Sequence, residues 1–524
     1  MTTKLRWEPQ RWQFIESNCG EAASPASVGS AASVDSHGLA DSVGLLAVTS
    51  ATQAVPVFQA AAKRRRRWTH GAIARMAAVA TSNATCRALA GGCHLAGTRA
   101  VATRFSTCLS ICLSICLAIA VGVSSAEDWS RFRGPDGLGI AKSSRPLVRW
   151  SSTEGLTWKT PLPGAGASSP VVFGDRVYLT AYTGYFVPGE SDGEIDNLQR
   201  HLMAIQLADG KIVWDKSVKA KLPEEPRIRD HGFAANSVAV DAQRIYAFFG
   251  KTGVFAFDHQ GKSLWQADVG SNTHGWGSSP SPVLHKDWVF INASVESGSL
   301  VALDRATGAE RWRADGIRES WSTPVVVIAP SGREELVVPV QGRVMAFAPA
   351  TGELLWSCKT DIGWYMVPSV VAADGIVYCL GGRSGIASLA VRAGGNGDVT
   401  ESHRLWTSLK GSNVSSPVYY QGHLYWAHDS RGIAYCAKAD TGEVVYEQRL
   451  ERAGQFYSSA LLADGRLYYL TREGKMFVVA AKPEFELLAV NDLADRSTFN
   501  SSPAVSGDRL LIRSDKFLYS IGKR

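Results

Sequence analysis

The sequence predicts an all-β protein: an eight-bladed β-propeller of four-stranded antiparallel blades, closed by pairing of its N- and C-terminal strands. Two recurring landmarks predict this fold, and both repeat from Trp158 onward in units of about 45 residues. No unit shows the hydrophobic period of a helix. A single four-stranded sheet cannot bury both of its faces, so the units must stack around a common axis.

The first landmark is a turn followed by a strand that ends in an aromatic residue. It occurs as ADGKIVW (208–214), HQGKSLW (259–265), ATGAERW (306–312), ATGELLW (350–356) and DTGEVVY (440–446), and Trp406 ends a similar strand. The glycine permits a tight turn, and the aromatic ring is a large flat body that can wedge between blades and bury roughly 150–250 Å². We therefore expect these aromatic residues to be structural and place none of them in a site.

The second landmark opens the innermost strand of each unit and occurs eight times. Its copies are SSPVV (168–172), NSVAV (236–240), SPSPV (279–283), STPVV (322–326), VPSVV (367–371), SSPVY (415–419), SSALL (458–462) and SSPAV (501–505). Serine and small apolar residues at these positions let eight backbones approach the axis without clashing. Hairpin signals such as Gly174-Asp175 follow most copies, because these residues supply the backbone conformations that tight hairpins need.

The last unit predicts how the ring closes. Ser501 to Ile521 has room for only three strands, and the missing outer strand is predicted to be Leu156 to Thr160. Pairing the two ends of the repeat region within one blade removes the free edges of the ring.

Charge and cysteine content divide the chain into two parts. The full chain has 55 Lys and Arg against 48 Asp and Glu, of which residues 1–126 hold 12 and 5, so the remainder carries 43 of each sign. A neutral body gives little support to nucleic-acid binding, and we expect no nucleic-acid partner. Outside the leader the cysteines are Cys358, Cys379 and Cys436, an odd set in which at most one disulfide forms. We favour their interpretation as buried small apolar residues.

Residues 1–126 are interpreted as a leader. An apolar segment at about 105–123 follows two arginines and ends in small residues up to Ala126, which is typical of a Sec-type signal peptide cleaved near Ala126. Export to the periplasm, the cell envelope or the extracellular space follows from this interpretation, and the alternative is a retained membrane anchor. Because a signal peptide does not normally begin a hundred residues into a protein, we hypothesise an internal translation start, such as Met76, or a disordered N-terminus. Residues 127–157 are then a lead-in segment and 158–524 the propeller.

The repeats resemble the pyrroloquinoline-quinone (PQQ)-like, tryptophan-docking β-propeller family. The fullest copy of its motif runs from Ala302 through Asp304 and Thr307-Gly308 to Trp312, and Trp129 to Pro135 resembles a segment often found before such propellers. The resemblance covers residues 129–521 and implies the fold. The family contains BamB-type propellers that assist outer-membrane-protein assembly as well as quinone-dependent alcohol and sugar dehydrogenases, so it does not by itself imply a function.

The resemblance to the dehydrogenases is incomplete. Those enzymes have an adjacent Cys-Cys pair over the quinone and a set of Glu, Asn and Asp residues that holds Ca²⁺, but this sequence contains no Cys-Cys pair. The acidic loop Glu190 to Asn197 does not match a calcium-loop pattern. We therefore expect no cofactor and no metal site, with PQQ and Ca²⁺ as the alternative. BamB-type propellers are usually lipoproteins, and no cysteine follows the predicted cleavage point here.

A binding site is predicted where the loops enter the innermost strands, because these loops share one face of a propeller around the mouth of the axial channel. Aromatic, imidazole and amide groups are concentrated there, as a ligand pocket or an interaction hot spot requires. The candidate ligand- or partner-binding residues are His231, Asn236, His274, Trp276, Trp321, Trp364, Tyr365, Asn413, Phe456 and Asn500. The alternative is that these side chains only cap the channel and pack the blade tops together. No catalytic residue is assigned.

These observations favour an exported, non-catalytic propeller that acts as a protein- or polymer-binding scaffold in the periplasm or cell envelope. A membrane contact is expected only through an uncleaved leader. The alternative is a PQQ-dependent dehydrogenase-like oxidoreductase with its site at the channel mouth. The sequence shows no serine-nucleophile elbow, no CxxC and no phosphate-binding glycine loop, so it gives no support to nucleophilic hydrolysis or nucleotide chemistry.

Overall fold

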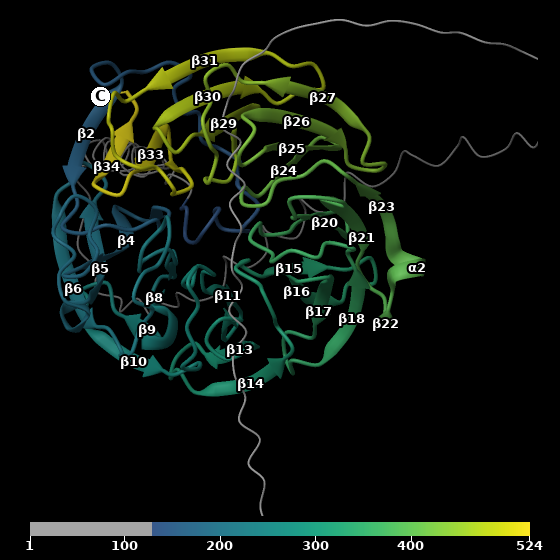
Figure 1. The fold of residues 1–524 in the computed structure, drawn as a ribbon, viewed down its shortest axis with the longest axis horizontal. Helices are drawn as coiled ribbons and strands as arrows, with labels where there is room; N and C mark the ends of the chain where they lie inside the picture. The colour runs from purple at the N-terminus through teal and green to yellow at the C-terminus, as the bar shows by residue number, and fades with distance from the viewer. Residues whose placement is uncertain (1–127, 524) are drawn as a thin grey trace, which may run out of the picture. The chain divides into compact units, whose positions relative to one another are not determined.

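A computed structural model of the chain describes residues 128–523. The predicted signal peptide and the hypothetical start at Met76 lie outside the described residues. Within residues 128–523, no helix is long and apolar enough to cross a membrane. Eight antiparallel sheets surround a common axis in this part of the chain, and the eight-bladed propeller predicted from the repeats is confirmed (Figure 1).

The first four blades follow each other along the chain, each numbered from the axis outward. Blade 1 contains β3 (Val171–Phe173), β4 (Arg176–Thr183), β5 (Gln199–Gln206) and β6 (Ile212–Lys219). Blade 2 contains β7 (Ala239–Val240), β8 (Ile245–Phe248), β9 (Val254–Phe257) and β10 (Ser263–Ala267). Blade 3 contains β11 (Val283–His285), β12 (Trp288–Ala293), β13 (Ser299–Asp304) and β14 (Glu310–Asp315). Blade 4 contains β15 (Val325–Ile328), β16 (Glu334–Val340), β17 (Arg343–Phe347) and β18 (Leu354–Lys359).

The remaining blades complete the ring. Blade 5 contains β19 (Val371–Ala373), β20 (Ile376–Leu380), β21 (Ser388–Arg392) and β23 (Arg404–Ser408). Blade 6 contains β24 (Val418–Tyr420), β25 (His423–Ala427), β26 (Ile433–Lys438) and β27 (Val444–Arg449). Blade 7 contains β28 (Leu461–Ala463), β29 (Arg466–Leu470), β30 (Lys475–Ala480) and β31 (Leu487–Asp492). Blade 8 contains β32 (Ala504–Ser506), β33 (Arg509–Arg513), β34 (Phe517–Ile521) and, from the start of the described chain, β2 (Leu156–Pro161).

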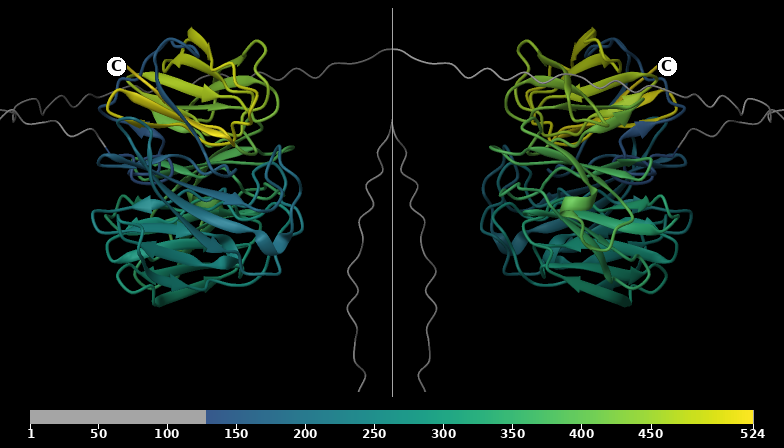
Figure 2. Two further views of the ribbon diagram at one scale, coloured as in Figure 1. Left: turned by 90° about the vertical axis from the view of Figure 1, so that its left-hand side faces the viewer. Right: turned by 90° about the vertical axis from the view of Figure 1, so that its right-hand side faces the viewer.

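The ring closes in blade 8, as the sequence predicts. β2 pairs antiparallel with β34, with Lys159 opposite Tyr519 and Thr160 opposite Leu518. Lys159 also holds the seam from outside, since its ammonium group lies 2.9 Å from a carboxylate oxygen of Asp495 and 3.7 Å from the centre of the Phe517 ring. In the side views, the first described strands (blue) lie beside the last strands of the chain (yellow) (Figure 2).

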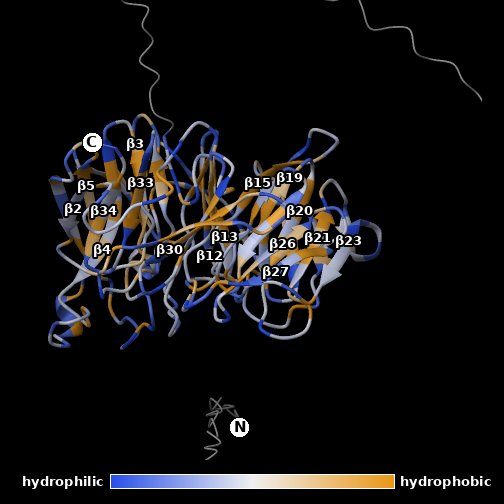
Figure 3. Cartoon of the chain, turned by 90° about the horizontal axis from the view of Figure 1, so that it is seen from above, coloured by the Kyte–Doolittle hydropathy of each residue, from blue (hydrophilic) through white to orange (hydrophobic). Residues whose placement is uncertain are grey.

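Hydrophobic residues fill the interfaces between blades, because the inner and middle strands are buried on both faces. Every residue of β8, β9 and β13 is buried, whereas the outer strand β6 is mostly exposed. The hydropathy colouring shows the same pattern, with hydrophobic residues concentrated in the strands (Figure 3). Cys358, Cys379 and Cys436 are free thiols in these interfaces, and burial raises the pKa of Cys358 and of Cys436 to about 11.

The aromatic residue of the first landmark docks on the next blade. The indole N–H of Trp312 in blade 3 donates to the carbonyl oxygen of Pro349 in blade 4 at 3.0 Å. Its ring lies against Gly352, where an added Cβ would be only 2.5 Å from Trp312 Cε3. The same contact recurs for Trp158 with Gly210, Trp265 with Gly308, and Trp406 with Gly442. The turn glycine is therefore needed both for its backbone conformation and for the space that the indole occupies.

A pair of glycines separates these two requirements. Gly352 and Gly342 both have positive φ (75° and 77°), but an added Cβ meets nothing within 4 Å at Gly342. We expect Gly342→Ala to cost about 1–2 kcal/mol through backbone strain alone. Gly352→Ala is expected to cost about 2 kcal/mol more, because the Trp312 ring must move from a packed site. Urea unfolding of both variants measures the difference, and equal losses would show that docking on this turn is not tight.

The lead-in segment crosses the axis from one side of the ring to the other. The carbonyl oxygen of Trp129 accepts a hydrogen bond from Val172 N in blade 1, and that of Ser130 accepts one from Val240 N in blade 2. The Arg133 guanidinium then donates to the carbonyl oxygen of Pro417 in blade 6. Beyond it, β1 (Ile140–Ala141) pairs in parallel with β28 of blade 7. The segment thus spans the channel at the end where the innermost strands finish.

Two short additions lie outside this plan. β22 (Gly397–Asp398) pairs in parallel with β18 at the outer edge of blade 4, and α2 (Thr400–His403) follows it. They replace the tight docking turn in blade 5, so Trp356 of blade 4 instead donates its indole N–H to the buried Glu335 carboxylate at 2.7 Å. Two 3-10 turns, η1 (Ile195–Asn197) and η2 (Gly250–Thr252), lie in the loops of blades 1 and 2.

Candidate functional site

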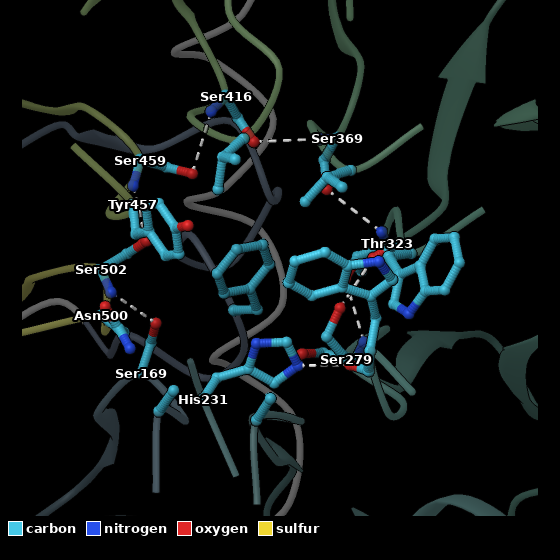
Figure 4. Close-up of a pocket in the computed structure, with 18 of the residues that line it drawn as sticks. Ser169, His231, Ser279, Thr323, Ser369, Ser416, Tyr457, Ser459, Asn500 and Ser502 are labelled. Carbon is cyan, nitrogen blue, oxygen red and sulfur yellow. Dashed lines mark hydrogen bonds between the residues drawn. The ribbon is translucent and has the colours of Figure 1, made fainter. Parts of the chain in front are cut away.

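A closed circle of hydrogen bonds surrounds the axis where the eight innermost strands begin. In each blade one serine or threonine hydroxyl oxygen accepts a hydrogen bond from the backbone N–H of the equivalent residue in the preceding blade, at 2.8–3.1 Å. Figure 4 labels Ser169, Thr323, Ser369, Ser416, Ser459 and Ser502 of this set, with dashed lines marking hydrogen bonds between neighbours. We call the set the hydroxyl ring: Ser169, Ser237, Ser281, Thr323, Ser369, Ser416, Ser459 and Ser502.

The hydroxyl ring explains why the second landmark contains Ser or Thr at one fixed position. The N–H groups at the start of these strands point around the ring, and a buried N–H without a partner costs about 1–3 kcal/mol. An alanine would leave room for the neighbouring backbone but would offer no acceptor. All eight ring residues are buried, and the last bond, from Ser502 N to Ser169 Oγ at 3.0 Å, joins blade 8 to blade 1.

A pocket of about 960 Å³, which we call the axial well, opens above the hydroxyl ring. Seven ring residues line it, all except Ser237. The layer above consists of the residues two positions earlier in each blade: Ala167, Ala235, Ser279, Trp321, Val367, Val414, Tyr457 and Asn500. His231, Trp276, Tyr365 and Arg383 complete the wall near the mouth, and Phe132 of the lead-in segment also lines the well. Because that segment crosses the opposite end of the channel, the well is open at the mouth and closed below.

His231 is held as a neutral imidazole at the wall of the well. Its Nε2 lies 2.6 Å from the carbonyl oxygen of Trp276, so Nε2 carries the hydrogen and donates it. Burial lowers the pKa of His231 below its ordinary value of 6.5, although the hydrogen bond to Trp276 opposes this effect. Nδ1 therefore has a free lone pair and can accept a hydrogen bond.

Three aromatic rings form a continuous wall. The ring centre of Tyr365 lies 6.3 Å from that of Trp276 and 5.6 Å from that of Trp321, the latter in an edge-to-face arrangement. Trp321 is fixed by a 2.8 Å hydrogen bond from its indole N–H to the carbonyl oxygen of Gly277. Such pairs are favourable aromatic geometries, and they hold the wall in one conformation.

Arginines cover aromatic rings around the mouth. Arg383 donates to the Tyr365 hydroxyl at 3.2 Å and lies over the ring of Trp364, 5.7 Å from its centre. Arg472 lies 4.1 Å from the centre of the Tyr457 ring and forms an ion pair with Asp230 at 3.1 Å. These cation–π contacts hold long side chains in place at a rim that solvent reaches.

The structure brings five of the ten predicted site residues together in the axial well: His231, Trp276, Trp321, Tyr365 and Asn500. Trp364 lies at the rim and is 39% exposed. His274 stacks against the edge of Trp321 at 5.0 Å and faces a separate, smaller cavity.

Three predicted residues are buried within the blade tops and do not line the well. Asn236 donates to the carbonyl oxygen of Pro280 at 2.8 Å and so joins blade 2 to blade 3. Asn413 is fully buried, and its backbone N–H donates to Asp429. Phe456 packs edge-to-face against Tyr469 and Phe477 in a hydrophobic cluster. For these residues the structure matches the alternative interpretation, in which side chains near the mouth pack the blades together.

Two contributors to the well come from outside the opening loops. Arg383 lies between β20 and β21, and Phe132 lies in the lead-in segment. Neither position carries a repeat signal that could have placed it at the axis. The hydroxyl ring did carry a signal, because Ser or Thr recurs at the same position in all eight opening strands.

The smaller cavity beside His274 contains a buried carboxyl group, Glu296. Burial raises its pKa from 4.5 to about 7, against the opposing hydrogen bond from Ser278. An ion pair at 2.6 Å between Arg200 and Glu224, both also buried, lines the same cavity.

Glu296 is expected to make stability depend on pH. Below pH 4.5 the Glu296 carboxyl is protonated in both the folded and the unfolded chain. Above that pH it ionises first in the unfolded chain, which favours unfolding. The contribution of Glu296 to stability is therefore lost as pH rises through about 7. We expect Glu296→Gln to raise stability by roughly 3 kcal/mol at pH 8 and to leave it nearly unchanged at pH 4. Thermal unfolding at both pH values checks this, and an equal effect at the two would contradict it.

The fold and the axial well define a class: a PQQ-like, tryptophan-docking propeller. The chain belongs to the family described as outer membrane protein assembly factor BamB, whose profile matches residues 136–275, 250–402 and 341–514. The chain is 24% identical over 327 residues to the outer membrane protein assembly factor BamB of Yersinia pestis, covering 52% of this chain and 78% of that protein. It is 24% identical over 369 residues to BamB of Burkholderia pseudomallei, covering 60% and 84%.

Solved structures of enzymes share the fold as well. A europium-containing methanol dehydrogenase superimposes with a TM-score of 0.55 over 76% of this chain and 98% of its own, at 12% sequence identity. At this identity the similarity shows the fold alone.

Proposed function

We propose that the protein is an exported, non-catalytic propeller that binds a protein or polymer partner in the periplasm or cell envelope through the mouth of the axial well. The observation that carries this proposal is the mouth itself, where Trp276, Tyr365 and Arg383 converge and are fixed by contacts within the protein. Tryptophan, tyrosine and arginine are the residues that most often dominate binding energy at interfaces. Family membership supports a role in the cell envelope, since the related proteins are named as assembly factors for outer-membrane proteins.

Pre-organisation supports the same proposal. The hydrogen bonds of His231 and Trp321 to neighbouring backbone carbonyls fix the wall before any partner arrives. A side chain that is already fixed loses little conformational freedom on binding, and about 0.5–1.5 kcal/mol is saved for each side chain that need not be ordered.

The dehydrogenase alternative requires a quinone and its calcium ion in the same well. Calcium is bound by carboxylate and carbonyl oxygens. Among the described residues that line the well there is no carboxylate; the polar side-chain groups are hydroxyls, one amide, one imidazole, one guanidinium and two indole N–H groups. This donor set does not match the Glu, Asn and Asp set of the quinone dehydrogenases, and we derive no catalytic step through a quinone.

Site-specific photo-crosslinking tests the proposed function. A photoreactive amino acid replaces Trp364 at the rim in one variant and Leu487 on the outer strand β31 in a control; the two side chains are 39% and 44% exposed. We expect one dominant adduct in cells at position 364, suppressed by excess unmodified protein, and only background at position 487. Equal labelling at both positions, or none at position 364, would contradict the proposal. So would turnover of an alcohol or sugar after addition of PQQ and Ca²⁺.

A further inference from the structure

The hydroxyl ring has unused hydrogen-bonding capacity directed at the axis. Each hydroxyl oxygen accepts one backbone N–H and retains its own O–H donor and a second lone pair. None of the eight ring hydroxyls donates to a protein group within residues 128–523. Seven of these groups line the bottom of the axial well. A ligand that reaches them can therefore both donate and accept hydrogen bonds.

The side chains that line the lower well are uncharged. Arg383 is the only charged side chain among the described residues that line it, and it lies near the mouth, engaged with Tyr365 and Trp364. A charged group that descended to the hydroxyl ring would lose its water and find no counter-charge among the residues that line the lower well, which is unfavourable. The chemistry of the ring therefore favours an uncharged ligand rich in hydroxyl groups.

The upper well offers surfaces of two kinds. Trp276, Trp321 and Tyr365 present an aromatic wall, against which the C–H face of a sugar ring can pack. His231 Nδ1 offers an acceptor, and the Tyr457 hydroxyl, which points toward the axis, has no partner among the described residues (Figure 4).

From these three features we infer that the axial well binds a neutral sugar unit. The inference rests on the proposed function, because it names the chemistry that the mouth recognises. Because the lead-in segment closes the far end, the unit must enter from the mouth, so the well takes a free sugar or the end of a glycan and not its middle.

Titration calorimetry of the whole protein tests the inference. The neutral probes are glucose, galactose, N-acetylglucosamine and maltotriose, and glucuronate is the charged counterpart of glucose. We expect at least one neutral probe to bind and glucuronate to bind at least about tenfold more weakly than glucose. Maltotriose distinguishes between the two possible ligands, a free sugar and the end of a glycan. If maltotriose binds more tightly than glucose, the ligand is a glycan end; if it binds equally or more weakly, the ligand is a free sugar. Failure of all neutral probes, or preference for glucuronate, would overturn the inference.

Two ring variants provide a matched pair. Ser416→Ala removes a hydroxyl that lines the well, and Ser237→Ala removes one that does not; each leaves one backbone N–H of the preceding blade without its acceptor. We expect affinity for the neutral probe to fall about three- to tenfold in Ser416→Ala and to stay unchanged in Ser237→Ala. Tyr457→Phe should cause a similar loss without touching the ring. Equal losses in both serine variants would mean that affinity follows blade stability and would overturn the inference.

The inference and the proposed function fail separately. If no sugar binds while a polypeptide is crosslinked at position 364, the mouth is a polypeptide site and only the sugar inference is wrong. If a neutral sugar binds in the well but no adduct forms at position 364, the well is a small-molecule site and the scaffold function is wrong.

Discussion

A chain that begins at Leu162 is expected to lose at least about 5 kcal/mol of stability and to unfold over a broad range of denaturant. The shortened chain lacks β2, so blade 8 loses its outer strand and β34 becomes a free edge. It also loses the docking of Trp158, whose indole N–H donates to the carbonyl oxygen of Leu207 in blade 1 at 3.1 Å. Guanidinium unfolding followed by tryptophan fluorescence measures the effect.

Adding the missing segment in trans provides the control. A peptide of residues 128–161 contains β2 and the lead-in segment, and we expect it to restore a sharp transition in the shortened chain. If the shortened chain unfolded at the same denaturant concentration as the full chain, ring closure by β2 would be unimportant for stability.

The combined variant His231→Ala, Trp276→Ala, Tyr365→Ala is expected to reduce partner binding by about 100-fold or more, because buried aromatic anchors at interfaces each contribute about 2 kcal/mol or more. These three side chains lie on one side of the axial well and support one another through the 2.6 Å bond of His231 to Trp276 and the contact between the rings of Trp276 and Tyr365. The yield of the adduct at position 364 is the measurement.

A control on the outer surface separates this effect from a general loss of exposed apolar area. Ile212, Leu264 and Leu354 are 39–48% exposed on outer strands of three blades. Their combined replacement by alanine should leave adduct yield unchanged. A loss as large as that of the mouth variant would place the interface on the outer strands.

The repeat made most of the fold predictable. Each blade carries its own copy of the opening strand, and the shortage of one strand after Ser501 implied that residues 156–160 complete the last blade. The tight turn and the following tryptophan also implied a contact between blades, because an exposed indole at every repeat would be costly. The partner of that contact, a glycine of the next blade, becomes evident only in three dimensions.

The site was less predictable because loop position does not determine side-chain direction. Asn500 lies two positions before the ring hydroxyl of its blade and lines the well, whereas Asn236 lies one position before its own and donates to the Pro280 carbonyl of blade 3. Arg383 reaches the well from a hairpin within blade 5, and Phe132 reaches it because the lead-in segment crosses the axis. The serines of the opening strands were interpreted by size alone, whereas their acceptor oxygens are what the neighbouring backbone requires.

Hydrogen exchange at the opening strands tests the central claim most directly, namely that eight hydroxyls form one unbroken ring that shapes the axial well. Mass spectrometry of peptic fragments compares residues 167–171 and 500–504, at the seam between blades 1 and 8, with residues 321–325, away from it. If the ring is closed, the seam segments have the same hydrogen bonds around the axis as the segment away from the seam, so we expect the three segments to exchange equally slowly. Faster exchange at the two seam segments would show that the ring is open there and that the well is not a fixed site.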